Sequence, residues 1–282
     1  MNNIMILGTS SGVGKTTVAA LLCRHFALQG KKVAPFKAQN LSLNSYITPD
    51  GEEIGIAQAY QAWACNIEPH WTMNPILLKP QGPGDMRIIF RGRPLDNASA
   101  RELRRPDTIR GAVREAYDIL AARSDVVILE GSGGAAEINL ADRDIANMPT
   151  AEMTGAPVVL VGDIDRGGVF AGLYGTYCLL PPRRRRLIKA FLINRFRGDE
   201  SILGPGIAKL EELTGVPCAG VLPLARLRLP AEDSLDLSRD RGRVSDGDDV
   251  RESWMDALEQ MYRDSRKHID YDLLEKIMAD GI

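Results

Sequence analysis

The stretch Gly8-Thr-Ser-Ser-Gly-Val-Gly-Lys-Thr-Thr17 decides the fold of this chain. It follows the short apolar run Ile4–Leu7 directly and opens a segment with helix-like spacing, Lys15–Gln29. In such a turn, successive backbone N–H groups point inward and cradle phosphate oxygens. The lysine can reach the terminal phosphates, and the threonine hydroxyl after it can bind Mg²⁺. The stretch therefore predicts a phosphate-binding loop for ATP or GTP.

The loop departs from the usual spacing at one point. Four residues normally separate the first glycine from the Gly-Lys pair. Here Thr9 occupies the position of that first glycine, and Gly8 lies one residue earlier. Because the strand–loop–helix context is retained, we expect the loop to bind nucleotide. The residues expected to form it are Thr9, Ser10, Ser11, Gly12, Val13, Gly14, Lys15, Thr16 and Thr17.

Short apolar runs alternate with helical patterns along most of the chain. The expected strands are Ile4–Leu7, Lys32–Phe36, Asp125–Leu129, Pro157–Val161, Ala190–Ile193 and Cys218–Leu222, and the expected helices are Lys15–Gln29, Ile56–Cys65, Thr108–Arg123, Val169–Leu180 and Gly204–Thr214. Runs that are apolar at consecutive positions are typical of strands buried on both faces of a parallel sheet. The pattern predicts an α/β fold of the P-loop NTPase class, a mostly parallel sheet flanked by helices. Two polar stretches, 38–55 and 81–105, are predicted to be loops or insertions.

The composition changes near the C-terminus. From Ala231 to Val250 the chain is rich in Asp, Ser, Arg and Gly and has few large apolar residues. We predict a P-loop domain over residues 1–237, a linker over 238–250 and a helical tail over 251–282. Apolar residues recur on one helical face over 254–262 and again over 269–278. We expect the tail to dock on the main domain, with a partner or dimer interface as the alternative.

Charge and apolar patterning exclude several classes of protein. The 282 residues include 35 Lys and Arg against 37 Asp and Glu, so the basic excess of most nucleic-acid binders is missing. No apolar run approaches the ~20 residues of a membrane helix, and the N-terminus does not resemble a secretory signal. The four cysteines form no CxxC pair. We therefore expect a cytoplasmic protein that binds neither nucleic acid nor membrane.

Polar side chains follow several of the expected strands. Glu130 ends one apolar run, Asp163 and Asp165 follow the next, and Asn194 follows the one after that. Ligands bind at the carboxyl ends of strands in open α/β sheets. We predict Glu130 to be a metal ligand or to orient a water molecule. Asn194 can hydrogen-bond an adenine edge, although a turn or capping role is the alternative.

Long polar motifs make the chain similar to the cobyric acid synthase family. The most distinctive reads Phe36-Lys-Ala-Gln-Asn-Leu-Ser-Leu-Asn-Ser-Tyr46. The other motifs are Thr48–Gly51, Met73–Pro80, Ala136–Leu140, Asp142–Met148, Val159–Ala171, Ile193–Asp199 and Leu229–Leu235. The resemblance covers residues 4–237 without a break, and several of its motifs are long and unusual.

The resemblance implies a fold similar to that of dethiobiotin synthetase. It also implies ATP-dependent amidation of corrin side-chain carboxylates, from cobyrinic acid a,c-diamide to cobyric acid, with ammonia derived from glutamine. A carboxylate is a poor electrophile, so ATP would convert it to an acyl phosphate that ammonia attacks. The expected catalytic residues are Lys15, Lys37 and Glu130, and the expected Mg²⁺ ligands are Thr16 and Glu130.

The same resemblance assigns further contacts. Asn194 and Pro223 would lie against adenine, and a homodimer is implied. The residues expected to face the corrinoid substrate are Gln39, Asn40, Ser42, Asn44, Ser45, Asp163 and Asp165. Candidates for a third metal ligand are Asp163, Asn44 and Asp50.

The chain departs from the family after Leu237. Full-length members continue into a glutaminase domain, whose triad needs a cysteine nucleophile. Here about 45 residues follow Leu237, and they contain no cysteine. None of the four cysteines sits in the glycine-flanked sharp turn that such a nucleophile needs. We expect a separate glutaminase subunit or free ammonia to supply the nitrogen.

Two other functions share part of the pattern. A dethiobiotin synthetase-like carboxylase or related amide ligase would use Lys37, Glu130 and Asn194, but would leave the motifs over 38–51 and 136–148 unexplained. A switch ATPase of the chromosome-partitioning type has an additional lysine early in its phosphate loop. Here Thr9, Ser10 and Ser11 follow Gly8, so that lysine is missing.

Overall fold

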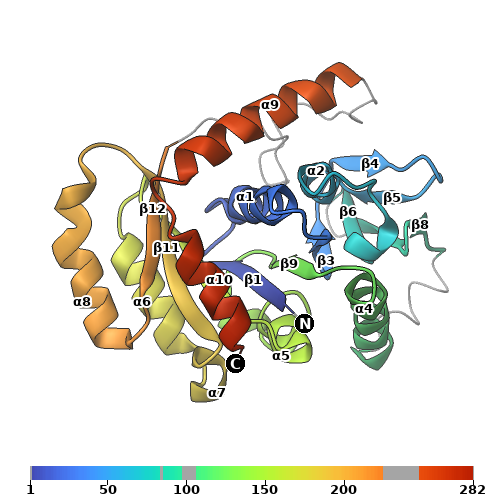
Figure 1. Ribbon diagram of the computed structural model, residues 1–282. Helices are drawn as coiled ribbons and strands as arrows, with labels where there is room; N and C mark the ends of the chain where they lie inside the picture. The colour runs from blue at the N-terminus through green and yellow to red at the C-terminus, as the bar shows by residue number, and fades with distance from the viewer. Residues whose placement is uncertain (1, 83–84, 97–105, 225–247, 282) are drawn as a thin grey trace.

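The apolar runs form a six-stranded parallel sheet at the centre of the protein (Figure 1). The computed structural model describes residues 2–82, 85–96, 106–224 and 248–281. In sheet order the strands are β12 (Cys218–Pro223), β11 (Ile188–Phe196), β10 (Val158–Asp163), β1 (Asn2–Gly8), β9 (Val126–Glu130) and β2 (Val33–Phe36). The predicted parallel α/β fold is confirmed.

Alternate residues of the strands pack into two separate cores, one on each face of the sheet. On β1, Ile4 and Ile6 belong to one core and Met5 and Leu7 to the other. The first face is covered by α1 (Lys15–Leu28), α2 (Ile56–Ala64), α9 (Asp248–Ser265) and α10 (Tyr271–Asp280). The second face is covered by α4 (Pro106–Ala121), α5 (Met148–Thr154), α6 (Val169–Leu179) and α8 (Gly204–Thr214), and the short α7 (Pro182–Arg185) precedes β11. Helices on both faces explain why the strands are apolar at consecutive positions.

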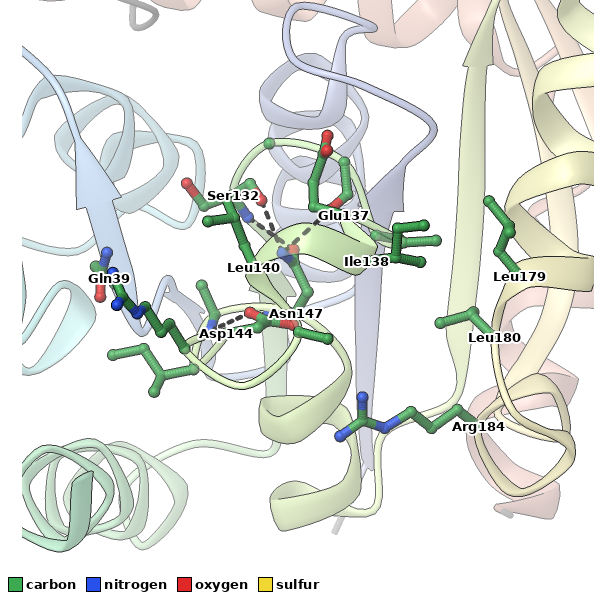
Figure 2. Close-up of a pocket in the computed structure, with 18 of the residues that line it drawn as sticks. Gln39, Ser132, Glu137, Ile138, Leu140, Asp144, Asn147, Leu179, Leu180 and Arg184 are labelled. Carbon is green, nitrogen blue, oxygen red and sulfur yellow. Dashed lines mark hydrogen bonds between the residues drawn. The ribbon is translucent and has the colours of Figure 1, made fainter.

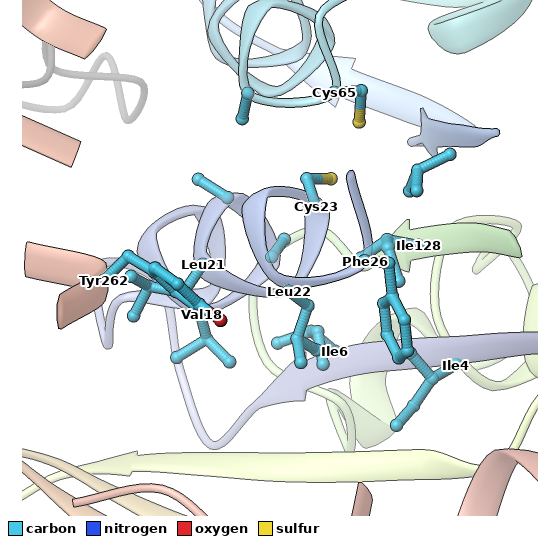
Figure 3. Packing of buried hydrophobic residues seen from close by; sticks show 14 of the residues in the cluster. Ile4, Ile6, Val18, Leu21, Leu22, Cys23, Phe26, Cys65, Ile128 and Tyr262 are labelled. Atoms are coloured by element: carbon cyan, nitrogen blue, oxygen red, sulfur yellow. The ribbon is translucent and has the colours of Figure 1, made fainter. Parts of the chain in front are cut away.

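Helix α1 lies between the sheet and the outer helices. Val18, Leu22 and Phe26, which are spaced four residues apart, point from α1 toward Ile4 and Ile6 of the sheet (Figure 3). On its other side α1 packs against α2 and α9. Nearly every apolar side chain of α1 is therefore buried, which holds the phosphate-binding loop at its N-terminus in place. None of the described helices combines the length and apolar character that a membrane span requires.

Parts of the stretches 38–55 and 81–105, which were predicted to be loops or insertions, form strands in the residues that the structure describes. A second sheet contains, in order, β3 (Gln39–Leu41), β6 (Ile76–Gly82), β7 (Asp85–Phe90) and β8 (Arg93–Pro94), and β4 (Ser45–Ile47) pairs with β5 (Glu53–Gly55). Only one of these pairings is long-range: β3 pairs with β6 more than thirty residues later, whereas β4–β5 and β6–β7 pair neighbours in the chain. Residues 97–105 lie outside the described part.

The C-terminal helices dock on the main domain. Trp254 of α9 stacks on Tyr60 of α2, with ring centroids 4.8 Å apart, and Leu258 is fully buried. His25 of α1 contacts the Tyr262 hydroxyl through Nδ1 at 2.9 Å and Glu275 of α10 through Nε2 at 2.7 Å. Helix α9 begins at Asp248, inside the segment 238–250 that was predicted as a linker. The rest of that segment and the end of the predicted domain at residue 237 lie outside the described residues.

The turn between α9 and α10 covers the edge of the central sheet. Ala219 O accepts the Asp270 N–H at 2.8 Å, and His268 O accepts the Val221 N–H at 3.0 Å. Gly220 has φ +146°, and a Cβ there would lie 2.0 Å from His268 O. Only glycine allows this close approach. An edge strand covered in this way cannot pair with another chain.

We predict that Leu258→Ala lowers the free energy of unfolding by about 2–5 kcal/mol, because it leaves a cavity between α9 and the core. The matched control is Leu213→Ala, since Leu213 is 51% exposed and its loss is expected to change stability by less than about 0.5 kcal/mol. Urea unfolding of both variants measures the difference. Equal stabilities would show that the tail does not contribute to the core.

Candidate functional site

The phosphate-binding loop lies where the strand order changes direction. The loop follows β1, which lies between β9 and β10. It therefore lies at the carboxyl end of the sheet, where open α/β sheets bind ligands. Thr9 N donates to Val161 O at 3.0 Å, and Gly131 N donates to Ile6 O at 2.9 Å. The loop after β9 is attached as well, because Ala135 N donates to Gly8 O at 2.9 Å. The neighbouring strands thus fix both ends of the site.

The glycines of the loop are required by close contacts. Gly14 has φ +100°, and a Cβ there would lie 2.0 Å from the Asn194 side-chain nitrogen. A Cβ at Gly8 would lie 2.6 Å from a Val13 methyl group. Gly8 therefore meets the steric requirement that the first glycine of the loop usually meets, although it lies one residue earlier in the sequence. The shifted spacing leaves a loop in which the backbone still turns tightly.

Lys15 lies across this loop and is 6% exposed. Its Nζ donates to Ser10 O at 3.1 Å and to Gly133 O at 2.8 Å. A phosphate oxygen is a stronger acceptor than a carbonyl oxygen, because it carries charge. The lysine is thus already placed between the two loops that would enclose a phosphate.

Glu130, the last residue of β9, is the centre of a buried polar network. Its Oε1 accepts hydrogen bonds from Thr16 Oγ1 at 2.8 Å and from Lys37 Nζ at 2.9 Å. Its Oε2 accepts from Gln61 Nε2 at 2.6 Å. Glu130 is 1% exposed and Lys37 3%. The structure therefore brings together three predicted site residues from β9, α1 and the end of β2.

Gln61 was missed by sequence reasoning. It lies on α2 with Gln58, and both side chains are fully buried. Residues three apart share one face of a helix, so two glutamines facing a core were the available signal. Gln58 Oε1 accepts from Asn40 Nδ2 at 3.2 Å. Within the described part of the chain, Gln58 Nε2 and Gln61 Oε1 have no hydrogen-bond partner.

Four predicted substrate residues are buried inside the fold: Asn40, Ser42, Asn44 and Ser45. Ser45 Oγ donates to Glu53 Oε1 at 2.6 Å, and Lys79 pairs with the same carboxylate. Burial raises the pKa of Glu53, but hydrogen bonds from Lys79 and Ser45 outweigh it and hold that pKa below its ordinary value. The structure gives these residues roles within the fold. Their contact with substrate stays a prediction.

The two predicted aspartates lie beside arginines of β11 and the loop after it. Asp163 Oδ2 accepts from Arg195 at 2.7 Å, and Asp165 Oδ1 accepts from Arg197 at 2.8 Å. Asp50 is exposed in the turn between β4 and β5. Ligation of a metal by Asp163, Asn44 or Asp50 stays a prediction.

Asn194 has a structural task in addition to its predicted one. Its Nδ2 donates to Val13 O at 2.8 Å, and its Oδ1 accepts the Arg195 N–H at 2.9 Å. Asn194 therefore holds the phosphate loop from the neighbouring strand, and Arg195 next to it has φ +64°. Pro223 lies at the carboxyl end of β12, the strand beside β11. Contact of Asn194 and Pro223 with adenine stays a prediction.

The residues present fit a magnesium nucleotide. Thr16 Oγ1 and Glu130 Oε1 are hard oxygen donors 2.8 Å apart, beside a loop whose glycines leave room for phosphates. Across the residues that the structure describes, no cluster of three or more His, Cys, Asp or Glu could bind a metal by itself. Mg²⁺ commonly takes one or two protein ligands and completes its shell with phosphate oxygens and water.

A hollow of about 450 Å³ opens beside the phosphate loop (Figure 2). It is lined by Ser11, by Gln39 of β3, by the loop from Ser132 to Asn147 that contains η2 (Ile138–Leu140), and by the end of α6. Asn147 shapes this loop, because its side chain accepts the Ser132 N–H at 2.9 Å and donates to Ser132 O at 2.8 Å. Burial raises the pKa of the Asp144 carboxyl, although hydrogen bonds from the Asn147 and Ala146 N–H groups act against it.

We predict that Lys37→Met lowers the free energy of unfolding by about 3–5 kcal/mol, because it leaves the buried Glu130 carboxylate without its cation. The double variant Lys37→Met/Glu130→Gln should recover more than half of that loss, since the buried charge is then gone. Urea unfolding of the wild type, both single variants and the double variant gives the coupling. Additive losses would contradict a buried ion pair.

Relatives of the chain include a probable cobyric acid synthase of Methanoculleus marisnigri, which is 49% identical over 98% of this chain and 55% of that protein. A probable cobyric acid synthase of Methanosarcina acetivorans is 51% identical over 85% of this chain and 50% of its own length. The cobyric acid synthase of Listeria innocua is 50% identical over 84% and 47%. The predicted resemblance is confirmed, and the chain spans about half the length of the curated relatives it matches.

Solved structures that match the chain include the signal recognition particle receptor FtsY of Elizabethkingia anophelis. The two chains are 16% identical with a TM-score of 0.45, and the match covers 78% of this chain and 56% of the FtsY chain. Residues 4–235 match the family model of the CobQ/CobB/MinD/ParA nucleotide binding domain. That match covers most of the chain and includes the phosphate loop, Lys37, Glu130 and Asn194. The chain therefore belongs to the family of CobQ/CobB/MinD/ParA nucleotide-binding domains.

Proposed function

We propose that this chain catalyses the ATP-dependent amidation of corrin side-chain carboxylates that leads from cobyrinic acid a,c-diamide to cobyric acid. The observation that carries the proposal is the buried network in which Lys37, Thr16 and Gln61 meet on Glu130 beside the phosphate loop. A site of this kind offers positive charge and a metal-binding oxygen pair next to the phosphates. The near 50% identity to cobyric acid synthases supports the choice of acceptor.

The reaction needs two displacements. A carboxylate oxygen of the substrate attacks the γ-phosphorus of ATP, the bond to the bridging oxygen breaks, and ADP leaves. Ammonia then attacks the carbonyl carbon of the acyl phosphate, loses a proton and expels inorganic phosphate, which leaves an amide. Negative charge grows on the phosphoryl oxygens in the first step and on the carbonyl oxygen in the second.

The residues of the chain can be given tasks in these steps. Lys15 neutralises charge on the transferred phosphoryl group, and its position between Ser10 O and Gly133 O supports this role. Lys37 stabilises the acyl phosphate, and Glu130 holds the Lys37 ammonium in place through the hydrogen bond at 2.9 Å. Mg²⁺, held by Thr16 and Glu130, would supply further charge neutralisation for the phosphates.

The remaining predicted contacts complete the proposal. The loop residues from Thr9 to Thr17 bind the phosphates, and Asn194 and Pro223 border the adenine. Gln39 faces the acceptor side, and its position on the wall of the hollow supports this. The chain spans only about half of the length of its relatives. In this proposal the nitrogen of each amide is ammonia, derived from glutamine by a glutaminase or taken from free solution.

The test is a turnover assay with Mg-ATP, cobyrinic acid a,c-diamide and ammonium, in which ADP release and the mass of the corrinoid are followed together. We expect a stepwise mass decrease as each hydroxyl of a carboxyl group is replaced by an amino group. Lys15→Ala should reduce the rate by about 10²-fold or more, because a charge is lost where charge develops. Lys209→Ala, on the exposed face of α8, is the control.

A corrinoid of unchanged mass, with ATP bound and the protein folded, would overturn the proposed acceptor. Turnover of a smaller carboxylate in the same assay would instead favour a related carboxylate-activating enzyme. Failure of glutamine to replace ammonium would show that the chain does not itself hydrolyse glutamine.

A further inference from the structure

Exposed aliphatic side chains gather around the hollow beside the phosphate loop. Of the ten large apolar side chains that are exposed among the described residues, four line it: Leu41 (38% exposed), Ile138 (68%), Leu140 (50%) and Leu179 (58%). Single exposed apolar residues are ordinary, but a group of them around a concave site marks a ligand or interaction surface. We call these four residues the aliphatic rim.

The rim is assembled from three separate parts of the fold. Leu41 ends β3, Ile138 and Leu140 belong to η2 after β9, and Leu179 ends α6. Figure 2 shows Ile138 on one side of the hollow and Leu179 and Leu180 across from it. Because these elements lie far apart in the sequence, the rim forms only when the chain is folded.

The inner wall of the hollow is polar and continuous with the nucleotide cradle. Ser11 and Gly133 line it, and Gly133 O accepts the hydrogen bond from Lys15 Nζ. Ser132 and Asn147 lie beside them. A molecule seated against the rim therefore presents its inner edge to the place where Lys15 would meet a phosphate.

Charged groups of both signs face the hollow. Arg143 is exposed on its wall, and Arg184 pairs with Glu152 at 3.2 Å. Of the acids, Glu137 is exposed, and Asp144 accepts hydrogen bonds from the backbone N–H groups of Ala146 and Asn147. The charges roughly balance, so bulk charge does not select the ligand. Aliphatic contact at the rim and the polar inner wall select the ligand instead.

We propose that the hollow seats the corrin ring, with the aliphatic rim against its apolar body and one peripheral carboxylate directed at the nucleotide cradle beside Lys15 and Gly133. This inference rests on the proposed function. A corrin combines a broad, methyl-covered body with acidic side chains around its periphery, and the hollow offers the complementary order of surfaces.

The apolar character of the rim allows the ring to bind in several orientations. Several carboxylates of one ring must visit a single phosphate site, so the ring must bind in more than one orientation. Contact between apolar surfaces is non-directional. A rim of leucine and isoleucine therefore holds the ring in each orientation equally well, whereas a fixed ion pair would favour a single one.

The experiment compares rim variants with matched controls of the full chain. Leu140→Asp is matched by Leu213→Asp on α8, because the two leucines are 50% and 51% exposed. Ile138→Asp is matched by Ile202→Asp, with exposures of 68% and 73%. Equilibrium dialysis measures the Kd for cobyrinic acid a,c-diamide in the presence of Mg²⁺ and a non-hydrolysable ATP analogue. Urea unfolding checks that all four variants are folded.

We expect each rim variant to raise the Kd for the corrinoid by about 10-fold, because it replaces buried apolar contact with a charge. Both controls should keep the wild-type Kd, and all four variants should keep the affinity for the ATP analogue. In turnover assays the KM of every successive amidation step should rise by a similar factor, while kcat changes little.

Three results would overturn the proposal. Rim variants that bind the corrinoid as tightly as their controls would exclude the hollow as its seat, while wild-type amidation would leave the proposed function intact. A rim variant that turns a dimer into a monomer with an unchanged Kd would identify the rim as a subunit interface. Wild-type protein that neither binds nor amidates the corrinoid would overturn the proposed function together with this inference.

Discussion

The site depends on one buried carboxylate. Glu130 is taken out of water at the end of β9, and a buried charge is tolerated only when it is paired and fully hydrogen-bonded. Its partners Lys37, Thr16 and Gln61 come from the end of β2, from α1 and from α2. These elements must therefore meet at one point before the charge is compensated. The same requirement places a lysine and two oxygen atoms, Thr16 Oγ1 and Glu130 Oε1, beside the phosphate loop.

Asn74 links the two-stranded sheet of β4 and β5 to Lys37 through hydrogen bonds. Asn74 Nδ2 donates to Lys37 O at 3.0 Å, and Asn74 Oδ1 accepts the Gly55 N–H at 3.0 Å. On α2, Gln58 lies one turn from Gln61 and accepts a hydrogen bond from Asn40 of β3 at 3.2 Å. Within the polar motif from Phe36 to Tyr46, the side chains of Asn40, Ser42 and Ser45 form hydrogen bonds inside the fold. This accounts for the burial of residues that were expected to touch substrate.

The hollow adds a surface of a different chemical character to the phosphate site. Its inner wall belongs to the nucleotide loops, and its outer rim is aliphatic. An acceptor that binds there is held mainly by contacts that carry no direction, and its reactive group is positioned by the polar wall. Such a division between holding and positioning suits a large acceptor with several equivalent reactive groups. In the proposed function, the residues that hold the acceptor therefore differ from those that act on phosphate.

The sequence by itself determined the parallel sheet, its helices and the phosphate loop, because strands buried on both faces and a glycine-rich turn leave local patterns. It also predicted site roles for Lys37, Glu130 and Asn194, which lie at or near the carboxyl ends of strands. Only the tertiary structure placed Gln61 on Glu130, made Asn194 a support of the phosphate loop and formed the second sheet from polar segments. The aliphatic rim arises in the same way, from residues 41, 138, 140 and 179. The physical reason is that these features come from contacts between residues far apart in the chain, and no local period or spacing records such contacts.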